Sequence, residues 1–286
     1  MVQHHTSYER KLNMIRHERA QTSENLVYYS YELFEQFPQI PLVVSTRLGG
    51  VSQGHLHSLN LSLSESVGDD PDAVITNRTR FYQIVGVEPE QVAQAQLVHG
   101  SHIEIVTDQT PCGTYHKLPK TDGLITNVPG RALFIPVADC AAIAFYDPNQ
   151  QVIAMIHAGW RGTLQGIIPE TVKTMREHFG SSPTDILVGV SPILGKCCYQ
   201  VRQDLVNIFM EAFPAQVHDF FEPQADDTYL FDIAAVFRWQ LLESGVQIDH
   251  IEESGICTAC HTDEFYSHRA EHGKTGRFAG LIVLRA

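Results

Sequence analysis

The chain has 286 residues, 43% of them hydrophobic, which is enough apolar surface to build the core of one large domain or two small ones. Its 20 basic and 33 acidic side chains give a formal net charge of −13, and no basic stripe stands out, so DNA and RNA are not expected as partners. Six cysteines are too few for a disulfide scaffold at this length, and we expect thiols or metal ligands.

The N-terminal segment is polar and rich in His and Arg. Residues 1–24 have little apolar content and are predicted to be a mobile or loosely docked arm, followed by a single domain over 25–286. Neither this segment nor any later run has the apolar length of a signal peptide or a membrane span. The sequence therefore predicts a cytoplasmic protein that does not contact a membrane.

Apolar periodicity predicts alternating strands and helices. Short apolar runs indicate strands at residues 42–46, 92–98, 102–106, 124–126, 132–137, 141–146, 152–157, 186–190, 250–253 and 281–284. Helical spacing indicates helices at 72–85, with Asp72 as the N-cap, and near 166–179, 202–212 and 233–244. The short connections within 132–157 predict antiparallel strands, which favours an α+β fold over a doubly wound sheet.

The string HAGWRGT, residues 157–163, follows one of these apolar runs. A buried strand would present His157 at its end, before a tight turn and a helix start. The backbone N–H groups of Gly162 and Thr163 would then be free to bind an anion such as phosphate, and Arg161 would add a forked cationic donor.

Two further strings place possible metal ligands at the ends of predicted elements. QLVHG (96–100) places His99 at the end of a predicted strand, and ADC (138–140) places Cys140 in a turn between two apolar runs. Together with His157 they would supply two imidazoles and one thiolate, an inner shell suited to zinc with a fourth position left for water or substrate. Zinc acidifies bound water, which makes attack on C6 of adenine a reasonable reaction, although the usual nucleobase-deaminase signature is absent.

These strings, with STRLGGVS (45–52), SLNLS (58–62), GVSPILGKCCYQV (189–201) and FYSHR…TGR (265–277), resemble in order the motifs of the YfiH-like proteins. That family has been called multicopper polyphenol oxidoreductase or laccase domain, and more recently purine nucleoside phosphorylase. The resemblance runs from about residue 41 to the C-terminus. It implies layered mixed β-sheets flanked by helices, in a CNF-toxin/YfiH-like fold of the cysteine-hydrolase type.

The resemblance also implies an activity. Phosphate would attack C1′ of adenosine or inosine, and of methylthioadenosine as a further substrate, and the same site would support zinc-dependent adenosine deamination. Asp139 would either orient an imidazole or cap a turn. The implied catalytic residues are His99, Cys140, His157 and Arg161, and the implied contacts to phosphate or nucleoside are Arg47, Asn60, Asp139, Gly162 and Thr163.

Two other enzyme classes remain open. Cys140 activated by His99 or His157 would make a cysteine hydrolase or amidase. A copper polyphenol oxidase would need several His-x-His pairs, whereas only His55-Leu56-His57 has that spacing, so copper is less expected than zinc.

A second group of cysteines lies outside the motifs assigned so far. Cys257-Thr-Ala-Cys260-His261 is a formal haem c string, but without an export signal it is better read as a turn with buried or paired thiols. A structural zinc held by Cys257, Cys260, His261 and His268 is the binding-module alternative. The adjacent Cys197 and Cys198 are predicted to pack at a strand-to-helix corner rather than to chelate one ion together.

Overall fold

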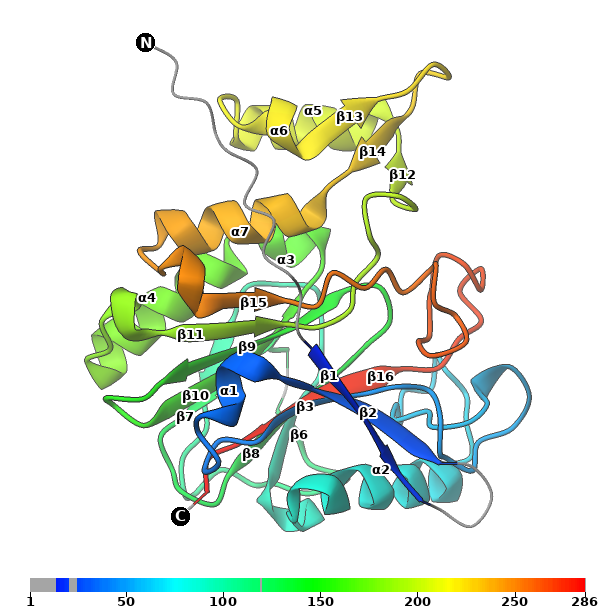
Figure 1. Ribbon diagram of the computed structural model, residues 1–286, viewed down its shortest axis with the longest axis vertical. Helices are drawn as coiled ribbons and strands as arrows, with labels where there is room; N and C mark the ends of the chain where they lie inside the picture. Colours follow the sequence, from blue (N-terminus) through cyan, green and yellow to red (C-terminus); the bar gives the residue numbers. More distant parts are fainter. Residues whose placement is uncertain (1–13, 21–24, 119, 286) are drawn as a thin grey trace.

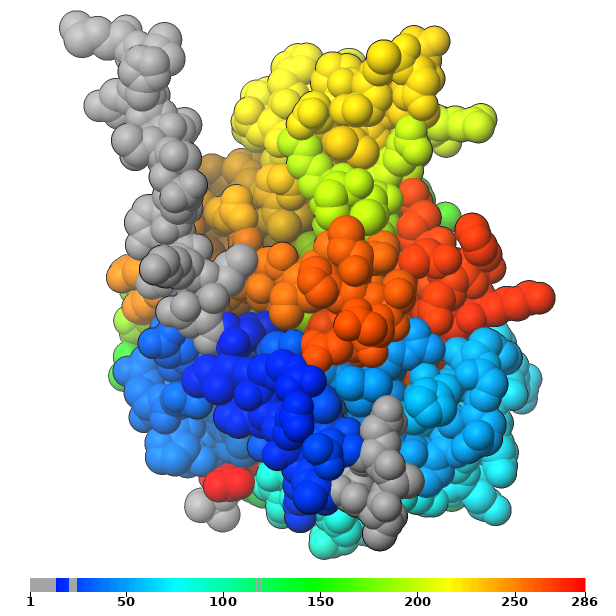
Figure 2. Space-filling model, turned by 45° about the vertical axis from the view of Figure 1, so that its right-hand side comes forward, coloured from blue at the N-terminus to red at the C-terminus, as the bar shows by residue number. Residues whose placement is uncertain are grey.

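The structure is a computed structural model that describes residues 14–20, 25–118 and 120–285. Two β-sheets pack face to face, and helices cover their outer faces (Figure 1). Beyond these four layers, a small three-stranded unit with two helices projects from one end of the molecule (Figures 1 and 2). The predicted α+β architecture of layered sheets flanked by helices is therefore confirmed.

The first sheet has seven strands and carries α2 on its outer face. In spatial order its strands are β1 (Met14–Arg19), β2 (Leu26–Tyr31), β3 (Leu42–Ser45), β16 (Phe278–Val283), β8 (Ala132–Val137), β4 (Val92–Ala95) and β6 (Lys117–Leu118). The pairs β4–β8 and β4–β6 are parallel and the others antiparallel, so the sheet is mixed.

The second sheet has six strands and is covered by α4 and α7. Its spatial order is β15 (Ile251–Glu253), β11 (Leu187–Val190), β9 (Ala141–Asp147), β10 (Val152–Ala158), β7 (Gly123–Thr126) and β5 (Ile103–Ile105). Every residue of β9 and β10 is buried, because one face packs on the first sheet and the other on helices. Such double coverage explains their uninterrupted apolar sequence.

The remaining elements complete the layers and the projecting unit. The small sheet has the order β12 (Gln200–Val201), β14 (Tyr229–Phe231) and β13 (Phe221–Pro223). The α-helices are α1 (Glu32–Glu35), α2 (Pro71–Val85), α3 (Trp160–Leu164), α4 (Ile167–Phe179), α5 (Gln203–Ala212), α6 (Val217–Phe220) and α7 (Ile233–Glu243). Short 3-10 helices occur at η1 (Gly54–Leu56), η2 (Pro89–Gln91), η3 (Pro183–Asp185) and η4 (Ile248–His250). Within the described ranges, no helix combines the length and apolar character needed to cross a bilayer.

Helix α2 shows how local sequence sets its ends. The Asp70 side chain accepts a hydrogen bond from the backbone N–H of Asp72, Pro71 occupies the first helical position, and Gly86 ends the helix with φ of 68°. The predicted cap at Asp72 was therefore wrong by two residues, because Asp72 is already inside the first turn.

Two expectations about chain organisation need correction. The structure describes residues 14–20 of the predicted N-terminal arm, and of these Met14–Arg19 form strand β1, which pairs along its whole length with β2. The rest of that arm, 1–13 and 21–24, lies outside the described residues. In the central segment, β9 and β10 are antiparallel as predicted, but β8 belongs to the other sheet. The turn between β8 and β9, in which Asp139 has φ of 74°, carries the chain from one sheet to the other.

Candidate active site

Three side chains from distant segments meet where the two sheets end. His99 comes from the loop after β4, Cys140 from the turn between β8 and β9, and His157 from the end of β10. One ligand atom from each lies within 4.8 Å of the others, and the two imidazole rings face each other edge to face at 4.8 Å between centroids. The three residues selected from the sequence are therefore brought together, although β4 ends at Ala95 and His99 stands in a loop with φ of 60°.

The β9–β10 hairpin fixes two of the three positions. His157 pairs with Ala142, and side-chain alternation places it on the same face as Met155, between the sheets. Cys140 precedes β9 and lies next to Gly159, where an added Cβ would be 2.8 Å from the Cys140 Sγ. Glycine at 159 therefore leaves room for the thiol.

Asp122 is the residue that organises this centre, and no motif in the sequence indicated it. It is fully buried at the start of β7, and its Oδ1 accepts a hydrogen bond of 2.8 Å from Nδ1 of His157. The remaining capacity of the carboxylate is taken by the backbone N–H groups of Val98, His99 and Gly100. One carboxylate thus orients the His157 ring and holds the loop that presents His99, leaving Nε2 of His157 to face the site.

The electrostatics of the centre favour a thiolate beside a charged imidazole. Burial raises the pKa of the Cys140 thiol, but the charge of His157 and hydrogen bonds from both imidazoles outweigh it and bring the pKa to about 6. Burial likewise lowers the pKa of His157, while the neighbouring Cys140 and Asp122 raise it to about 9. Cys140 is therefore poised to act as a metal ligand or as a nucleophile.

Arg161 lies on the exposed side of the centre. Its guanidinium stacks over the Trp160 ring at 4.3 Å and donates no hydrogen bond to the residues that the structure describes. Burial of the Tyr199 side chain and the nearby Cys140 thiolate raise the pKa of Tyr199, whereas the charge of Arg161 lowers it. Arg161 is thus a cation close to the centre with its donors available.

Thr163 does not supply the free anion-binding N–H expected from the sequence. The Thr163 N–H and hydroxyl both donate to the Gly159 carbonyl, and the Thr163 carbonyl accepts from Gln240. An added Cβ at Gly162 would lie 2.7 Å from the Gly100 carbonyl oxygen. Thr163 is therefore held within the protein, and glycine at 162 lets α3 pack closely against the His99 loop. The anion contact expected of the Gly162 N–H stays a prediction.

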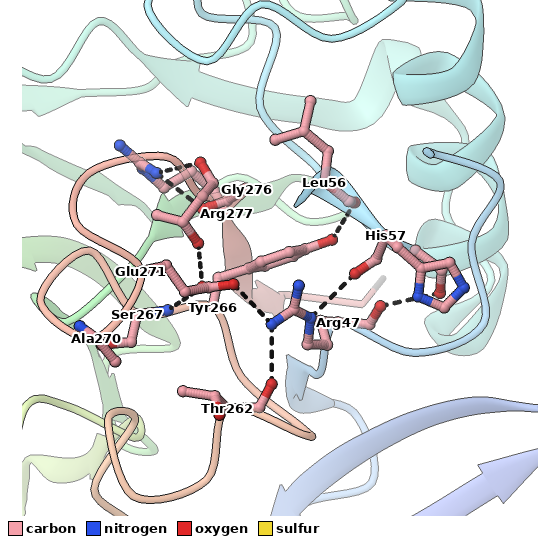
Figure 3. Close-up of polar contacts among 12 residues, drawn as sticks. Arg47, Leu56, His57, Thr262, Tyr266, Ser267, Ala270, Glu271, Gly276 and Arg277 are labelled. Carbon is pink, nitrogen blue, oxygen red and sulfur yellow. Dashed lines mark hydrogen bonds and ion pairs between the residues drawn. The ribbon is translucent and has the colours of Figure 1, made fainter. Parts of the chain in front are cut away.

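Arg47 links two loops (Figure 3). Its guanidinium donates to the carbonyls of His57 and Thr262 and to the Glu271 carboxylate, and it lies 4.4 Å from the centroid of the Tyr266 ring. These contacts use Nε and Nη1, and through them the arginine joins the segment after β3 to the C-terminal loop. The phosphate contact expected of Arg47 stays a prediction.

Asn60 is also engaged within the protein. It is fully buried, and its amide donates to Asp69 and to the Ser62 carbonyl while its oxygen accepts from the backbone N–H groups of Ser62 and Arg277. The side chain has no remaining hydrogen-bonding capacity for a nucleoside, so the predicted substrate contact is corrected to a structural one.

Asp139 does not orient an imidazole. Its carboxylate accepts hydrogen bonds from the hydroxyls of Thr258 and Ser267 and from the Arg269 backbone N–H. It therefore holds the C-terminal loop next to Cys140, and the orienting role that the sequence analysis considered for it belongs to Asp122.

Arg277 is a further charged group near the thiol. Burial lowers the pKa of this guanidinium, and the nearby Cys140 and Asp139 raise it. Its Nη1 donates to the carbonyls of Thr275 and Gly276. Arg277 lies in the TGR string, which by itself indicates no role for it, because only the fold places it near Cys140.

Known proteins are similar to this chain over most of its length. The purine nucleoside phosphorylase YlmD of Geobacillus stearothermophilus is 34% identical over 246 residues, which cover 85% of this chain and 89% of the relative. The purine nucleoside phosphorylase YfiH of Shigella flexneri is 33% identical over 240 residues, 84% of this chain and 92% of the relative.

Solved structures agree with these sequence relatives. The Bacillus licheniformis hypothetical protein YfiH has a TM-score of 0.85 at 31% identity and covers 94% of this chain and 99% of its own. The YlmD structure from Geobacillus stearothermophilus has a TM-score of 0.83 at 31% identity, and it covers 93% of this chain and 98% of its own. The family model for multi-copper polyphenol oxidoreductase laccase matches residues 41–285. The chain therefore belongs to this laccase-domain family, together with YfiH and YlmD.

Proposed function

We propose that the protein is a zinc-containing purine nucleoside phosphorylase acting on adenosine and inosine, and on methylthioadenosine as a further substrate, with adenosine deaminase activity at the same centre. The observation that carries the proposal is the meeting of His99, Cys140 and His157 within ligand distance of one another. The names of the relatives YlmD and YfiH support the phosphorylase activity.

The donor set fits zinc. Two imidazoles and a thiol of lowered pKa are ligands of the type and number found in catalytic zinc sites, and Asp122 holds His157 with Nε2 available. When bound, zinc supplies a Lewis-acidic centre with a fourth position open to water or substrate.

Phosphorolysis requires the chain to hold an anion beside the nucleoside. A phosphate oxygen forms a bond to C1′ while the bond from C1′ to N9 breaks, and the purine leaves with the electron pair and takes up a proton. The exposed guanidinium of Arg161 is the candidate phosphate contact, since its donors are not used by described residues.

The Arg161→Ala variant should selectively lose phosphate use. Removing a charge-assisted contact of about 1.5–3 kcal/mol lowers kcat/KM for phosphorolysis by about ten- to hundredfold. Deamination, which needs no phosphate, should change less. Steady-state assays of both reactions check this, with Arg176→Ala on the neighbouring α4 surface as the matched control. Equal loss of both activities would assign Arg161 to the nucleoside or to the fold.

Incubation with adenosine tests the proposed activity directly. With phosphate present we expect adenine and ribose 1-phosphate, and without phosphate we expect inosine, both separated by chromatography. Removal of zinc with a chelator should abolish both products, and adding zinc back should restore them. Zinc-loaded protein that forms neither product from adenosine, inosine or methylthioadenosine would contradict the proposal.

A cysteine hydrolase or amidase is the second candidate. The chain of contacts from Asp122 through His157 to Cys140, with the Cys140 pKa near 6, is the arrangement that activates a thiol nucleophile.

A copper polyphenol oxidase has less support. Among the described residues, neither of the two donor clusters groups several imidazoles, since one holds two His and one Cys and the other holds four Cys.

A further inference from the structure

We propose that the chain holds a second, structural zinc ion, bound by Cys197, Cys198, Cys257 and Cys260. This site is distinct from the centre of two imidazoles and one thiol. It would cross-link two turns that support the wall of the candidate active site.

The positions of the sulfur atoms match a tetrahedral tetrathiolate. All four Sγ atoms lie within 4.8 Å of one another, and Cys260 Sγ is 3.6 Å from that of Cys197 and 3.4 Å from that of Cys198. With a zinc–sulfur bond of about 2.3 Å, a regular tetrahedron separates its sulfur atoms by about 3.8 Å. A disulfide would need about 2.0 Å between two of them and would leave the other two thiols unused.

The fold builds the cluster from two turns held in register. Ile193 forms a parallel bridge with Cys257, donating to the Ile256 carbonyl and accepting from the Thr258 N–H. Beyond this bridge each segment turns back on itself: the Cys198 N–H donates to the Gly195 carbonyl, and the Cys260 N–H donates to the Cys257 carbonyl. The two turns therefore face each other with their thiols converging.

Further details are typical of thiolate ligands. The Gly195 N–H donates to the Cys257 Sγ at 3.3 Å, a hydrogen bond that stabilises negative charge on sulfur. An added Cβ at Gly195 would lie 2.9 Å from the Cys257 Cβ and 3.2 Å from its Sγ, so this close approach requires glycine. Cys197 and Cys260 are exposed, which gives an ion access to the site. Each thiol would release its proton to solvent on binding.

Two expectations from the sequence are overturned by this cluster. Cys197 and Cys198 do converge on a common point, because they lie in a turn and not in an extended strand. The alternative ligand set with His261 and His268 is wrong for this arrangement: Nδ1 of His261 contacts the Cys257 carbonyl, and neither histidine belongs to the donor cluster.

The cluster adjoins the candidate active site through Asp139. The Asp139 carbonyl accepts from the Leu194 N–H, and its carboxylate accepts from the Thr258 hydroxyl. Both turns that carry the cysteines are therefore tied to the residue that precedes Cys140. An ion at the four thiols would hold these turns together and stabilise the surroundings of the thiol.

Metal analysis of the purified full-length chain tests the proposal. We expect two zinc ions per chain in the wild type and one in Cys140→Ser. We also expect one in the double variant Cys198→Ser/Cys260→Ser and none in the triple variant that combines the three substitutions. Cys112→Ser, a thiol outside both clusters, is the matched control and should keep both ions.

A spectroscopic measurement covers the case in which the double variant does not fold. Zinc X-ray absorption on Cys140→Ser, which leaves the four-thiol cluster intact, should show four sulfur neighbours at about 2.3 Å. Cobalt substituted for zinc should give the absorption bands of tetrahedral thiolate coordination.

Several results would overturn the proposal. In Cys140→Ser, these results are zinc with mostly nitrogen or oxygen neighbours, iron in place of zinc, or no metal at all. A further one is an intact mass lower by two hydrogens, with a disulfide within the cluster. A wild type with one zinc that Cys140→Ser retains and Cys198→Ser/Cys260→Ser loses would support this site while contradicting the zinc centre of the proposed function.

Discussion

The Cys140→Ser variant is expected to lose one equivalent of zinc and the purine activities together. A serine hydroxyl stays protonated at neutral pH, whereas the Cys140 thiol has a pKa of about 6 and is ionised, so the substitution removes the anionic ligand of the centre. Zinc content by mass spectrometry and turnover of adenosine measured on the same preparation check this. The Cys112→Ser variant, which changes a partly buried thiol elsewhere, should keep both.

The same thiol separates the two candidate enzyme classes. If zinc holds Cys140, iodoacetamide should label it slowly in the native protein and faster after chelation. A free nucleophile predicts the opposite pattern, with immediate labelling and inactivation of zinc-loaded protein and protection by acyl or amide substrates. That result, with metal retained in Cys140→Ser, would replace the nucleoside mechanism by the hydrolase.

The Asp122→Asn variant is expected to weaken both the zinc centre and the fold. The two carboxylate oxygens accept hydrogen bonds from four donors. In asparagine an NH₂ group replaces one oxygen, and this group cannot accept a hydrogen bond from the N–H groups that it would face. Zinc affinity and activity should each fall by about 10–100-fold. The free energy of unfolding should fall by about 3 kcal/mol, because hydrogen bonds to a buried charge are lost.

Zinc titration and thermal unfolding measure these two effects separately. Asp147→Asn is the matched control, since Asp147 is an equally buried carboxylate at the opposite end of β9. It should lower stability without changing zinc affinity or activity. Unchanged zinc affinity in Asp122→Asn would show that the orientation of His157 does not depend on this carboxylate.

Part of the fold could be predicted from local pattern alone. Eight of the ten strands predicted from apolar runs start and end within two residues of the observed ones, as in 132–137 and 152–157. The strand predicted at 92–98 ends three residues earlier, at Ala95. The strand predicted at 281–284 begins three residues earlier, at Phe278. Strand β1 was missed, because it is polar and lies at a sheet edge, where pairing with one neighbour is sufficient. The sheet to which β8 belongs also could not be predicted, since periodicity indicates that a strand exists but not which strand it pairs with.

Residue type and motif also identified the reactive part of the site. His99, Cys140 and His157 are the chemically distinctive residues of three strings, and imidazole and thiol side chains limit the chemistry to metal binding or nucleophilic catalysis. Arg161 was found in the same way. Sequence by itself thus determined which reactive side chains the candidate site contains, because reactivity belongs to the side chain and is visible wherever that side chain stands.

The tertiary structure decided how every other polar group is used. Asn60 and Thr163 are satisfied by partners inside the protein, Arg47 joins two loops, and Asp122 gains its role from the pairing of β7 with β10. The cysteines at 197–198 and 257–260 converge through one bridge between segments about sixty residues apart. Such contacts depend on which distant segments pack together, and a buried polar group takes whatever partner that packing supplies, so no local pattern in the sequence specifies them.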